Sequence, residues 1–183
     1  MNGHQLIMGS LTDLVTGEKL EDTHDERYRQ KLARLLIEEK HYLRSDITPR
    51  MDLKVRAGDK CAIIKVDYGI TLRGKLCMIL KYGPGSIVTR RRPALAASRL
   101  LTDYQVPVVV VTNGESAEVL DGASGTVTAT GLAAVPSRSM LIHQTKGDSF
   151  PPIMAYRAEM ESRIMYAYEV DGSCPCDDTI CRL

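Results

Sequence analysis

The run that constrains the fold most is VPVVVVT, residues 106–112. Four consecutive valines favour a strand, because β-branched side chains fit a pleated sheet better than a helix. A strand that is apolar on every side chain must be covered on both faces. The run therefore predicts a central strand with packing layers above and below the sheet.

The segments before this run supply further elements. Apolar residues recur at helical spacing in DERYRQKLARLLIEEKHYL, and Thr23 or Asp25 can cap that helix. Turn residues at Ala57-Gly58-Asp59 and at Arg73-Gly74 separate three apolar or alternating stretches, which indicates an antiparallel meander. The expected elements are a helix from residue 25, strands at 51–55, 62–66 and 76–80, and a helix over 93–101.

After the central strand, Asn113-Gly114 predicts a turn into the strand AEVLD, and Gly122 to Gly125 closes a second hairpin. The order α-β-β-β-α-β-β predicts an α/β fold, one mixed sheet with a helix on each side. We expect an N-terminal arm at 1–23, a core at 24–132 and a C-terminal extension at 133–183. The extension carries a helix at about 153–170, whose Met and Tyr stripe suits core packing or a dimer face, and a Cys-rich tail.

Composition narrows the function classes. The chain has 183 residues and a net charge of +1, so it suits about one domain and lacks a generally basic surface. Its first residues lack the basic and apolar blocks of a secretion signal, and no run reaches the roughly 18 to 20 apolar residues of a membrane helix. Five unevenly spaced cysteines do not suit a disulfide framework. We expect a cytoplasmic protein with no membrane contact.

Two charged residues interrupt the apolar hairpin. With a turn at Arg73-Gly74, Asp67 and Lys81 lie almost opposite each other, and one bulge puts them on the same face. One interpretation is a cross-strand ion pair. The other adds Glu26 from the first helix, because two carboxylates and a lysine suit phosphodiester cleavage assisted by Mg²⁺. Glu26 can also serve simply as a helix-start carboxylate.

Residues 24 to about 121 resemble the N-terminal nuclease domain of type I restriction enzyme R subunits, within the PD-(D/E)xK restriction-endonuclease-like superfamily. The resemblance lies in the pieces DERYRQ, IKVDYGIT, LCMILKYG, RRRPALAASRLL and VPVVVVTNGESAEVLD, in that order. It implies a restriction-endonuclease-like αβββαβ core, Mg²⁺ or Mn²⁺ as cofactor and DNA as substrate. No motor motif is present, so ATP-driven translocation would need another chain.

The resemblance also assigns roles. It implies that Glu26 and Asp67 bind the metal with the Leu80 carbonyl, and that Lys81 is catalytic. The sequence departs from the family pattern at Ile79, where the family has a carboxylate that shares the face of the lysine. Asp52 is a candidate replacement, whereas Glu38 and Glu39 lie too far along the first helix.

These residues leave two functions open. One is a Mg²⁺-dependent DNA endonuclease with a degenerate motif. The other is an inactive module of the same fold that binds nucleic acid or a partner protein, with a homodimer among the partners expected.

Basic residues gather at the second helix, namely Arg90, Arg91, Arg92 and Arg99. A helix start rich in N–H donors and arginines suits phosphate, so these residues are candidates for nucleic-acid binding. The alternative is a solvated face beside acidic neighbours such as Asp103.

The tail holds Cys174, Cys176 and Cys181 within eight residues. Three thiolates suit Zn²⁺ or an iron–sulfur cluster, with a fourth ligand from Cys61, Cys77, His143 or a second chain. The tail is similar in layout to that of RecB-type relatives, which hold an iron–sulfur cluster. A flexible cysteine-bearing terminus is the alternative. If the tail binds metal, a third hypothesis is a small metal-bound interaction protein.

Overall fold

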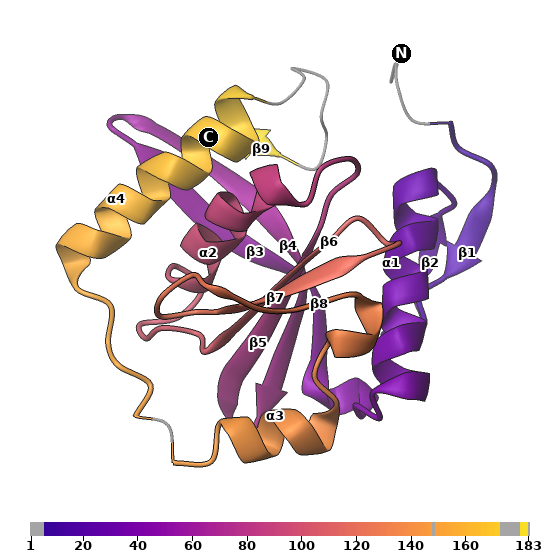
Figure 1. Ribbon diagram of the computed structural model, residues 1–183. Coiled ribbons are helices and arrows are strands. Elements are labelled where there is room, and N and C mark those ends of the chain that lie inside the picture. The colour runs from indigo at the N-terminus through magenta and orange to yellow at the C-terminus, as the bar shows by residue number, and fades with distance from the viewer. Residues whose placement is uncertain (1–5, 148, 173–179, 183) are drawn as a thin grey trace.

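A mixed sheet forms the centre of the computed structural model, which describes residues 6–147, 149–172 and 180–182 (Figure 1). Its strand order is β3-β4-β5-β6-β7-β8, with β9 added beside β4. Strands β5 and β6 are parallel, and their neighbours pair antiparallel. The strands are β3 (Ile47–Ala57), β4 (Lys60–Leu72), β5 (Lys75–Tyr82), β6 (Val108–Thr112), β7 (Ala117–Asp121), β8 (Val127–Thr130) and β9 (Cys181–Arg182).

Helices cover both faces of this sheet. On one side α1 (His24–Arg34) continues into a π-helical turn, η1 (Leu35–Glu39), beside the hairpin of β1 (Ser10–Thr12) and β2 (Lys19–Glu21). On the other side α2 (Arg91–Ser98) lies against α4 (Ala155–Met165), as Figure 1 shows. Short elements complete the chain: η2 (Arg44–Asp46), η3 (Val88–Arg90), η4 (Leu132–Ala134), α3 (Arg138–Gln144) and the π-helical η5 (Tyr166–Asp171).

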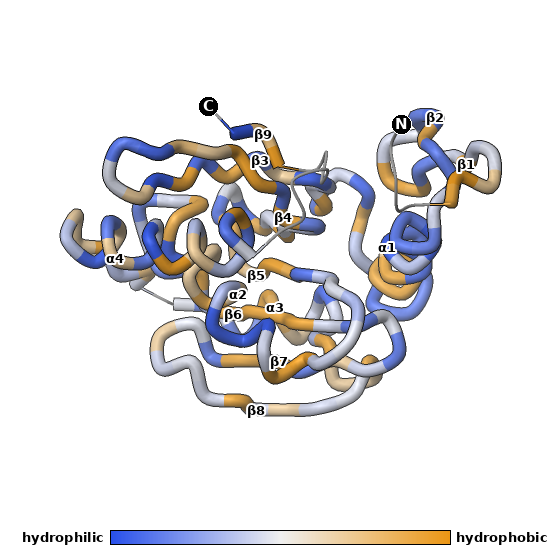
Figure 2. The backbone as a smooth tube through the Cα atoms, turned by 90° about the horizontal axis from the view of Figure 1, so that it is seen from above, coloured by the Kyte–Doolittle hydropathy of each residue, from blue (hydrophilic) through white to orange (hydrophobic). Residues whose placement is uncertain are grey.

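The central strand is β6, as its sequence predicts. Val110 packs with Leu32 and Leu36 beneath α1, whereas Val109 and Val111 face the cluster that contains the alanines of α2. All three valines are fully buried. Figure 2 shows hydrophobic residues along β5, β6 and β7 and hydrophilic ones over much of α1 and α4.

The expected α/β fold and its mixed sheet flanked by helices are confirmed. Arg73 and Gly74 form the β4–β5 turn with φ values of +53° and +75°, which matches the mirror-image turns favoured in hairpins. The register of β4 and β5 shifts between Ile70 and Thr71, where a bulge or irregularity interrupts the pairing. The second predicted hairpin, closed by Gly122 to Gly125, joins β7 to β8, whereas helix α3 and the β1–β2 hairpin were not predicted as separate elements.

The N-terminal arm is fastened to the core through Asp13. Its carboxylate is buried, forms an ion pair with Arg50 of β3 and accepts the backbone N–H groups of Val15 and Thr16. Burial alone would raise the pKa of Asp13, but these hydrogen bonds and the Arg50 charge lower it below its ordinary value. The adjacent Leu14 N–H donates to Gln30 of α1 at 2.8 Å. The described part of the arm therefore clasps α1 and β3.

Within the described part of the chain, every helix falls short of the length and apolar character that crossing a membrane requires.

The turn after β6 offers a test of the packing around α1. Gly114 has φ +85°, and a Cβ there would lie 2.3 Å from the Tyr28 ring. Gly17 has φ +79° but nothing within 4 Å of such a Cβ. We expect Gly114→Ala to lower the free energy of unfolding by about 2 to 3 kcal/mol and Gly17→Ala by about 1 kcal/mol, because only the first adds a clash to the backbone strain. Urea denaturation measures both, and equal losses would contradict the clash.

Candidate active site

Asp67 lies where the pairing of β4 and β5 ends. The last paired residues of this ladder are Tyr68 and Leu80, so Asp67 comes next to Lys81 in register. Its carboxylate is buried, and both oxygens have partners. The Tyr82 N–H donates to Asp67 Oδ2 at 2.8 Å, and Arg29 Nε donates to Oδ1 at 2.7 Å. Asp67 thus ties the end of β5 to α1.

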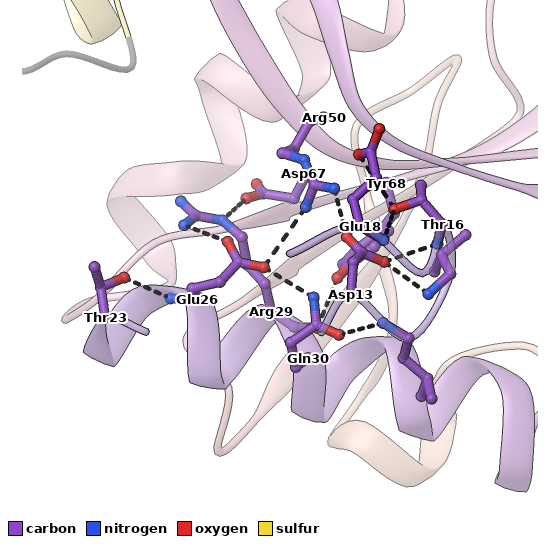
Figure 3. Close-up of polar contacts among 12 residues, drawn as sticks. Asp13, Thr16, Glu18, Thr23, Glu26, Arg29, Gln30, Arg50, Asp67 and Tyr68 are labelled. Carbon is purple, nitrogen blue, oxygen red and sulfur yellow. Dashed lines mark hydrogen bonds and ion pairs between the residues drawn. The ribbon is translucent and has the colours of Figure 1, made fainter. Parts of the chain in front are cut away.

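Glu26 lies in the first turn of α1, where the Thr23 hydroxyl accepts its backbone N–H at 3.1 Å. Its carboxylate accepts a hydrogen bond from Gln30 at 2.9 Å and lies 3.6 Å from both Arg29 and Arg50 (Figure 3). Glu26 is therefore a helix-start carboxylate and also part of a wider ionic network. The structure brings Glu26 and Asp67 together through Arg29, which contacts both.

Arg29 is the centre of this network, and it is not among the site residues that the sequence predicts. Burial tends to lower the pKa of its guanidinium, but Asp67 and Glu26 outweigh burial and raise the pKa above its ordinary value. The guanidinium also lies 5.6 Å from the centre of the Tyr82 ring. One signal could have found it, since Arg29 follows Glu26 by three residues on the same helix face.

Lys81 has a different partner. Its amine lies 3.1 Å from Glu169 Oε2 of η5, and only 6% of the side chain is exposed. Ile79, on the same strand, is fully buried in one cluster with Met165 and Val170 of the C-terminal helix. Among the described residues, no hydrogen bond or ion pair joins Lys81 to Asp67 or Glu26. The catalytic role of these three residues stays a prediction.

The donor set around Asp67 does not suit a divalent cation as it is arranged. Among the described residues, no three His, Cys, Asp or Glu side chains come close enough to hold a metal ion. Both oxygens of Asp67 are already bound, and Ile79 offers no ligand. Asp52, the candidate replacement, is largely exposed and paired with Lys65. A metal role for the Leu80 carbonyl stays a prediction.

The four arginines at α2 separate into different environments. Arg91 forms a two-pronged ion pair with Glu118 of β7 at 2.5 and 2.6 Å. Arg92 and Arg99 both bind Glu161 of α4, and Arg99 is almost fully buried. Arg90 has no ion pair within the described part of the chain. Phosphate binding by these arginines stays a prediction. Arg90 is the best candidate, because the other three already form ion pairs with glutamates.

Glu161 holds the C-terminal helix on the core. Its side chain is 1% exposed, and Arg92, Arg99 and Arg157 lie 2.6, 2.7 and 2.8 Å from its oxygens. Burial raises the pKa of Glu161, but the three arginines outweigh burial and lower the pKa below its ordinary value. The ion pairs that Glu161 of α4 forms with Arg92 and Arg99 are therefore charged in the folded protein and hold α4 against α2.

Only part of the cysteine tail lies within the described residues. Cys174 and Cys176 lie outside the described residues, whereas Cys181 is exposed in β9. Cys61 is half-buried and Cys77 buried, and His143 lies in the last turn of α3. A Zn²⁺ or iron–sulfur site at the tail stays a prediction.

Comparison with known proteins identifies the family. A family described as the type I restriction enzyme R protein N terminus matches residues 24–136, more than half of the chain. The chain belongs to this family. No curated protein and no solved structure matches it significantly.

The matched segment contains only some of the residues that surround the site. Asp67, Lys81, Glu26 and the α2 arginines lie within the matched R protein N-terminal segment, whereas α3, α4 and η5 lie beyond it. Glu161 and Glu169, which bind Arg92, Arg99 and Lys81, therefore come from a part of the chain outside the matched segment.

Removing the central arginine tests the Asp67 network. We expect Arg29→Ala to lower the free energy of unfolding by about 3 kcal/mol, because it leaves two poorly exposed carboxylates without their shared cation. Arg27→Ala is the matched control on the same helix, since Arg27 pairs with Asp22 at the surface and its loss should change stability little. Denaturant unfolding measures both.

In the Arg29→Ala background, Asp67→Asn should recover part of the loss, because it removes one unpaired charge. Additive effects of the two substitutions would contradict the proposed bridge.

The Glu161 pair predicts a specific dependence on pH. Because its pKa is lowered in the folded protein, its stabilising effect is complete above about pH 4.5 and declines as the pH falls further. We expect Glu161→Gln to cost about 3 to 5 kcal/mol near neutral pH and less below pH 4. Unfolding curves of the wild type and of Glu161→Gln, recorded from pH 3 to 7, measure how the difference in their free energies of unfolding changes with pH.

Glu159→Gln, on the same helix but exposed and paired only with Arg163 in the described part of the chain, is the control for removing one charge. If the loss of unfolding free energy in Glu161→Gln were the same at every pH, the charge of Glu161 would not contribute to stability.

Proposed function

We propose that this chain acts on DNA, as a restriction-endonuclease-like module that holds the phosphate backbone without cutting it. The observation that carries this choice is the state of Asp67, whose two oxygens are bound by Arg29 and by the Tyr82 N–H. A carboxylate engaged in this way is a structural group. Membership of the type I restriction enzyme R protein N-terminal family supports a role connected with DNA.

The remaining charges support binding. Arg90 stands at the start of α2 and packs against the backbone of Gly83, two residues after Lys81. The loop that follows β5 therefore carries a cation beside Gly83 and, at Gly85, a backbone with open space beside it, which a DNA strand can approach closely. No base-reading motif accompanies them, so contacts would be to phosphate and would weaken with salt. Such a DNA partner agrees with the expected cytoplasmic location.

A second candidate is metal-dependent hydrolysis of DNA. It is favoured by one observation, namely that Glu26 and Asp67 both surround a single guanidinium. Two carboxylates around one positive charge resemble a cation site in which the Arg29 guanidinium stands where the metal ion would bind. Hydrolysis would require Arg29 to leave Asp67.

DNA binding is tested by fluorescence anisotropy with a labelled duplex over a range of salt. We expect weak, salt-dependent binding, and we expect Arg90→Ala to weaken it and to reduce the slope of log K against log salt by about 0.9. Arg73→Asn is the control, because it removes one arginine at the opposite end of the hairpin and asparagine tolerates the positive φ there. Absence of binding at low salt would refute the proposal.

Cleavage is tested separately, by nicking of supercoiled plasmid with Mg²⁺ or Mn²⁺. We expect intact plasmid with the wild-type protein. Cleavage that is lost in both Lys81→Ala and Asp67→Asn would establish the second candidate instead. Cleavage that survives both substitutions would indicate a contaminating nuclease.

A further inference from the structure

We propose that a pocket at the start of α4 binds a carboxylate carried on an apolar or aromatic group, and that Arg157 holds the carboxylate. The pocket has a volume of about 430 Å³ and lies where the segment before α4 meets the chain that enters β6. Gln105 of the pocket precedes β6, whereas Asp67 binds Tyr82, whose partner Thr112 ends β6. The pocket is therefore at the opposite end of the sheet from Asp67 and does not rest on the proposed DNA binding.

The cluster of charges beside the pocket has more cations than carboxylates. Three arginines each form an ion pair with Glu161 and, within the described part of the chain, with no other acidic side chain, namely Arg92, Arg99 and Arg157. Burial lowers the pKa of Arg99 below its ordinary value, and the charges of the other two arginines lower it further, although Glu161 raises it. A second anion at this cluster would therefore be favourable.

Arg157 is the member of the cluster that a ligand can reach. It lines the pocket with a side chain that is 53% exposed, whereas the side chain of Arg99 is 6% exposed. The Arg157 Nε donates to Glu161 Oε1 at 2.8 Å, and the two terminal nitrogens have no hydrogen-bond partner among the described residues. A guanidinium with available N–H groups can bind a carboxylate through two parallel hydrogen bonds. Arg157 thus offers a position for a carboxylate at the pocket.

The walls of the pocket suit an apolar body attached to that carboxylate. Pro152, Ile153, Met154 and Tyr156 line it together with Arg157. Met154 is 77% exposed and Tyr156 is 72% exposed, so both are available to cover a ligand. A mainly apolar lining with a few placed polar groups is the usual form of a small-ligand site. Such a lining favours a carboxylate over the more strongly hydrated phosphate.

The pocket joins two parts of the chain. Arg99, Gln105 and Ala123 belong to the segment that matches the R protein N-terminal family, whereas residues 151–157 come from the extension beyond it. The matched segment alone therefore lacks Arg157 and most of the apolar wall. The binding that we propose is a property of the chain with its extension.

The test uses 3-phenylpropionate as the probe and the neutral 3-phenylpropionamide as its control, with methyl-labelled methionines observed by NMR. We expect 3-phenylpropionate to shift the Met154 methyl signal with a Kd in the millimolar range, because so small a ligand binds weakly. The signal of Met140, which is exposed on α3, should stay unchanged. The amide should bind about tenfold more weakly, because it lacks the charge. Met154→Leu and Met140→Leu assign the two signals.

Two arginines on α4 give a matched pair of substitutions. We expect Arg157→Gln to weaken binding of 3-phenylpropionate by about tenfold. Arg163→Gln should change it by no more than about twofold, since Arg163 is equally exposed but does not line the pocket. Arg157→Lys should restore only part of the binding, because lysine keeps the charge and loses the planar fork.

The apolar wall is tested without touching the charges. We expect Tyr156→Ala to weaken binding by about threefold, because an aromatic contact with the probe is lost. Tyr168→Ala is the control, since Tyr168 is also exposed on the C-terminal helix but does not line the pocket.

Two sources carry this ligand chemistry, a free carboxylic acid and the C-terminal residue of a peptide chain. A tripeptide that ends in phenylalanine with a free carboxylate distinguishes them. Tighter binding of the tripeptide than of 3-phenylpropionate would support a chain end as the ligand, and weaker binding would support a free acid.

A Met154 signal that neither probe moves would overturn the inference. Equal binding of the amide, or equal losses in Arg157→Gln and Arg163→Gln, would also contradict it, because the carboxylate would then have no specific partner. Inorganic phosphate that binds as tightly as 3-phenylpropionate would refute the apolar part of the site. Each of these failures leaves the proposed function intact, since DNA binding is measured separately.

Discussion

The burial of β4, β5 and β6 on both faces forces the charged side chains at their ends to find partners within the protein. Asp67 and Lys81 are both nearly inaccessible, and an unpaired charge at such depth costs several kcal/mol. Asp67 is matched by Arg29 of α1 and Lys81 by Glu169 of η5. The covering helices therefore supply opposite charges as well as apolar surface, and this requirement fixes which helix residues face the strand ends.

This pairing divides the predicted site between the two layers of the fold. Arg29 belongs to α1, whose apolar residues pack on the cluster of Val110. Glu169 belongs to η5, whose apolar residues pack on the opposite cluster with Ile79. The carboxylates and the lysine thus have their partners on different sides of the sheet, although they are neighbours in register along β4 and β5. A cross-strand ion pair, the simplest interpretation of Asp67 and Lys81, is replaced by two pairs that each reach a helix.

The elements of the fold could be predicted because they depend on local signals. The valine run marks β6, the Arg73-Gly74 turn fixes the β4–β5 hairpin, and the apolar spacing beyond residue 153 marks the C-terminal helix. The partners of the site residues could not be predicted in the same way. Arg29 lies 38 residues from Asp67, and the contact depends on how α1 crosses the sheet. Spacing within a strand carries no information about that crossing.

The arginines of α2 illustrate the same limit. In the sequence they form one basic patch, but they lie on a helix between two other elements, so neighbours in sequence face different partners. Arg91 meets Glu118 of β7, whereas Arg99 meets Glu161 of α4. Glu161 lies 62 residues beyond Arg99, in a segment that the resemblance does not cover. The charge of a patch is therefore visible in the sequence, but its availability is not.

The two functions considered for this fold need different charges to be available. Metal binding needs carboxylates, and phosphate binding needs a cation. Glu26 and Asp67 share the positive charge of Arg29, and Glu26 also lies beside Arg50, so both cations come from within the chain. A guanidinium in that position leaves a cation little to gain, because the carboxylates are already compensated. Lys81 needs a negative charge, and Glu169 supplies it with one oxygen unsatisfied among the described residues. Among the described residues, each half of the site therefore finds its opposite charge within the chain and also keeps one buried polar atom without a hydrogen-bond partner, namely Arg50 Nη1 beside Glu26 and Glu169 Oε1 beside Lys81.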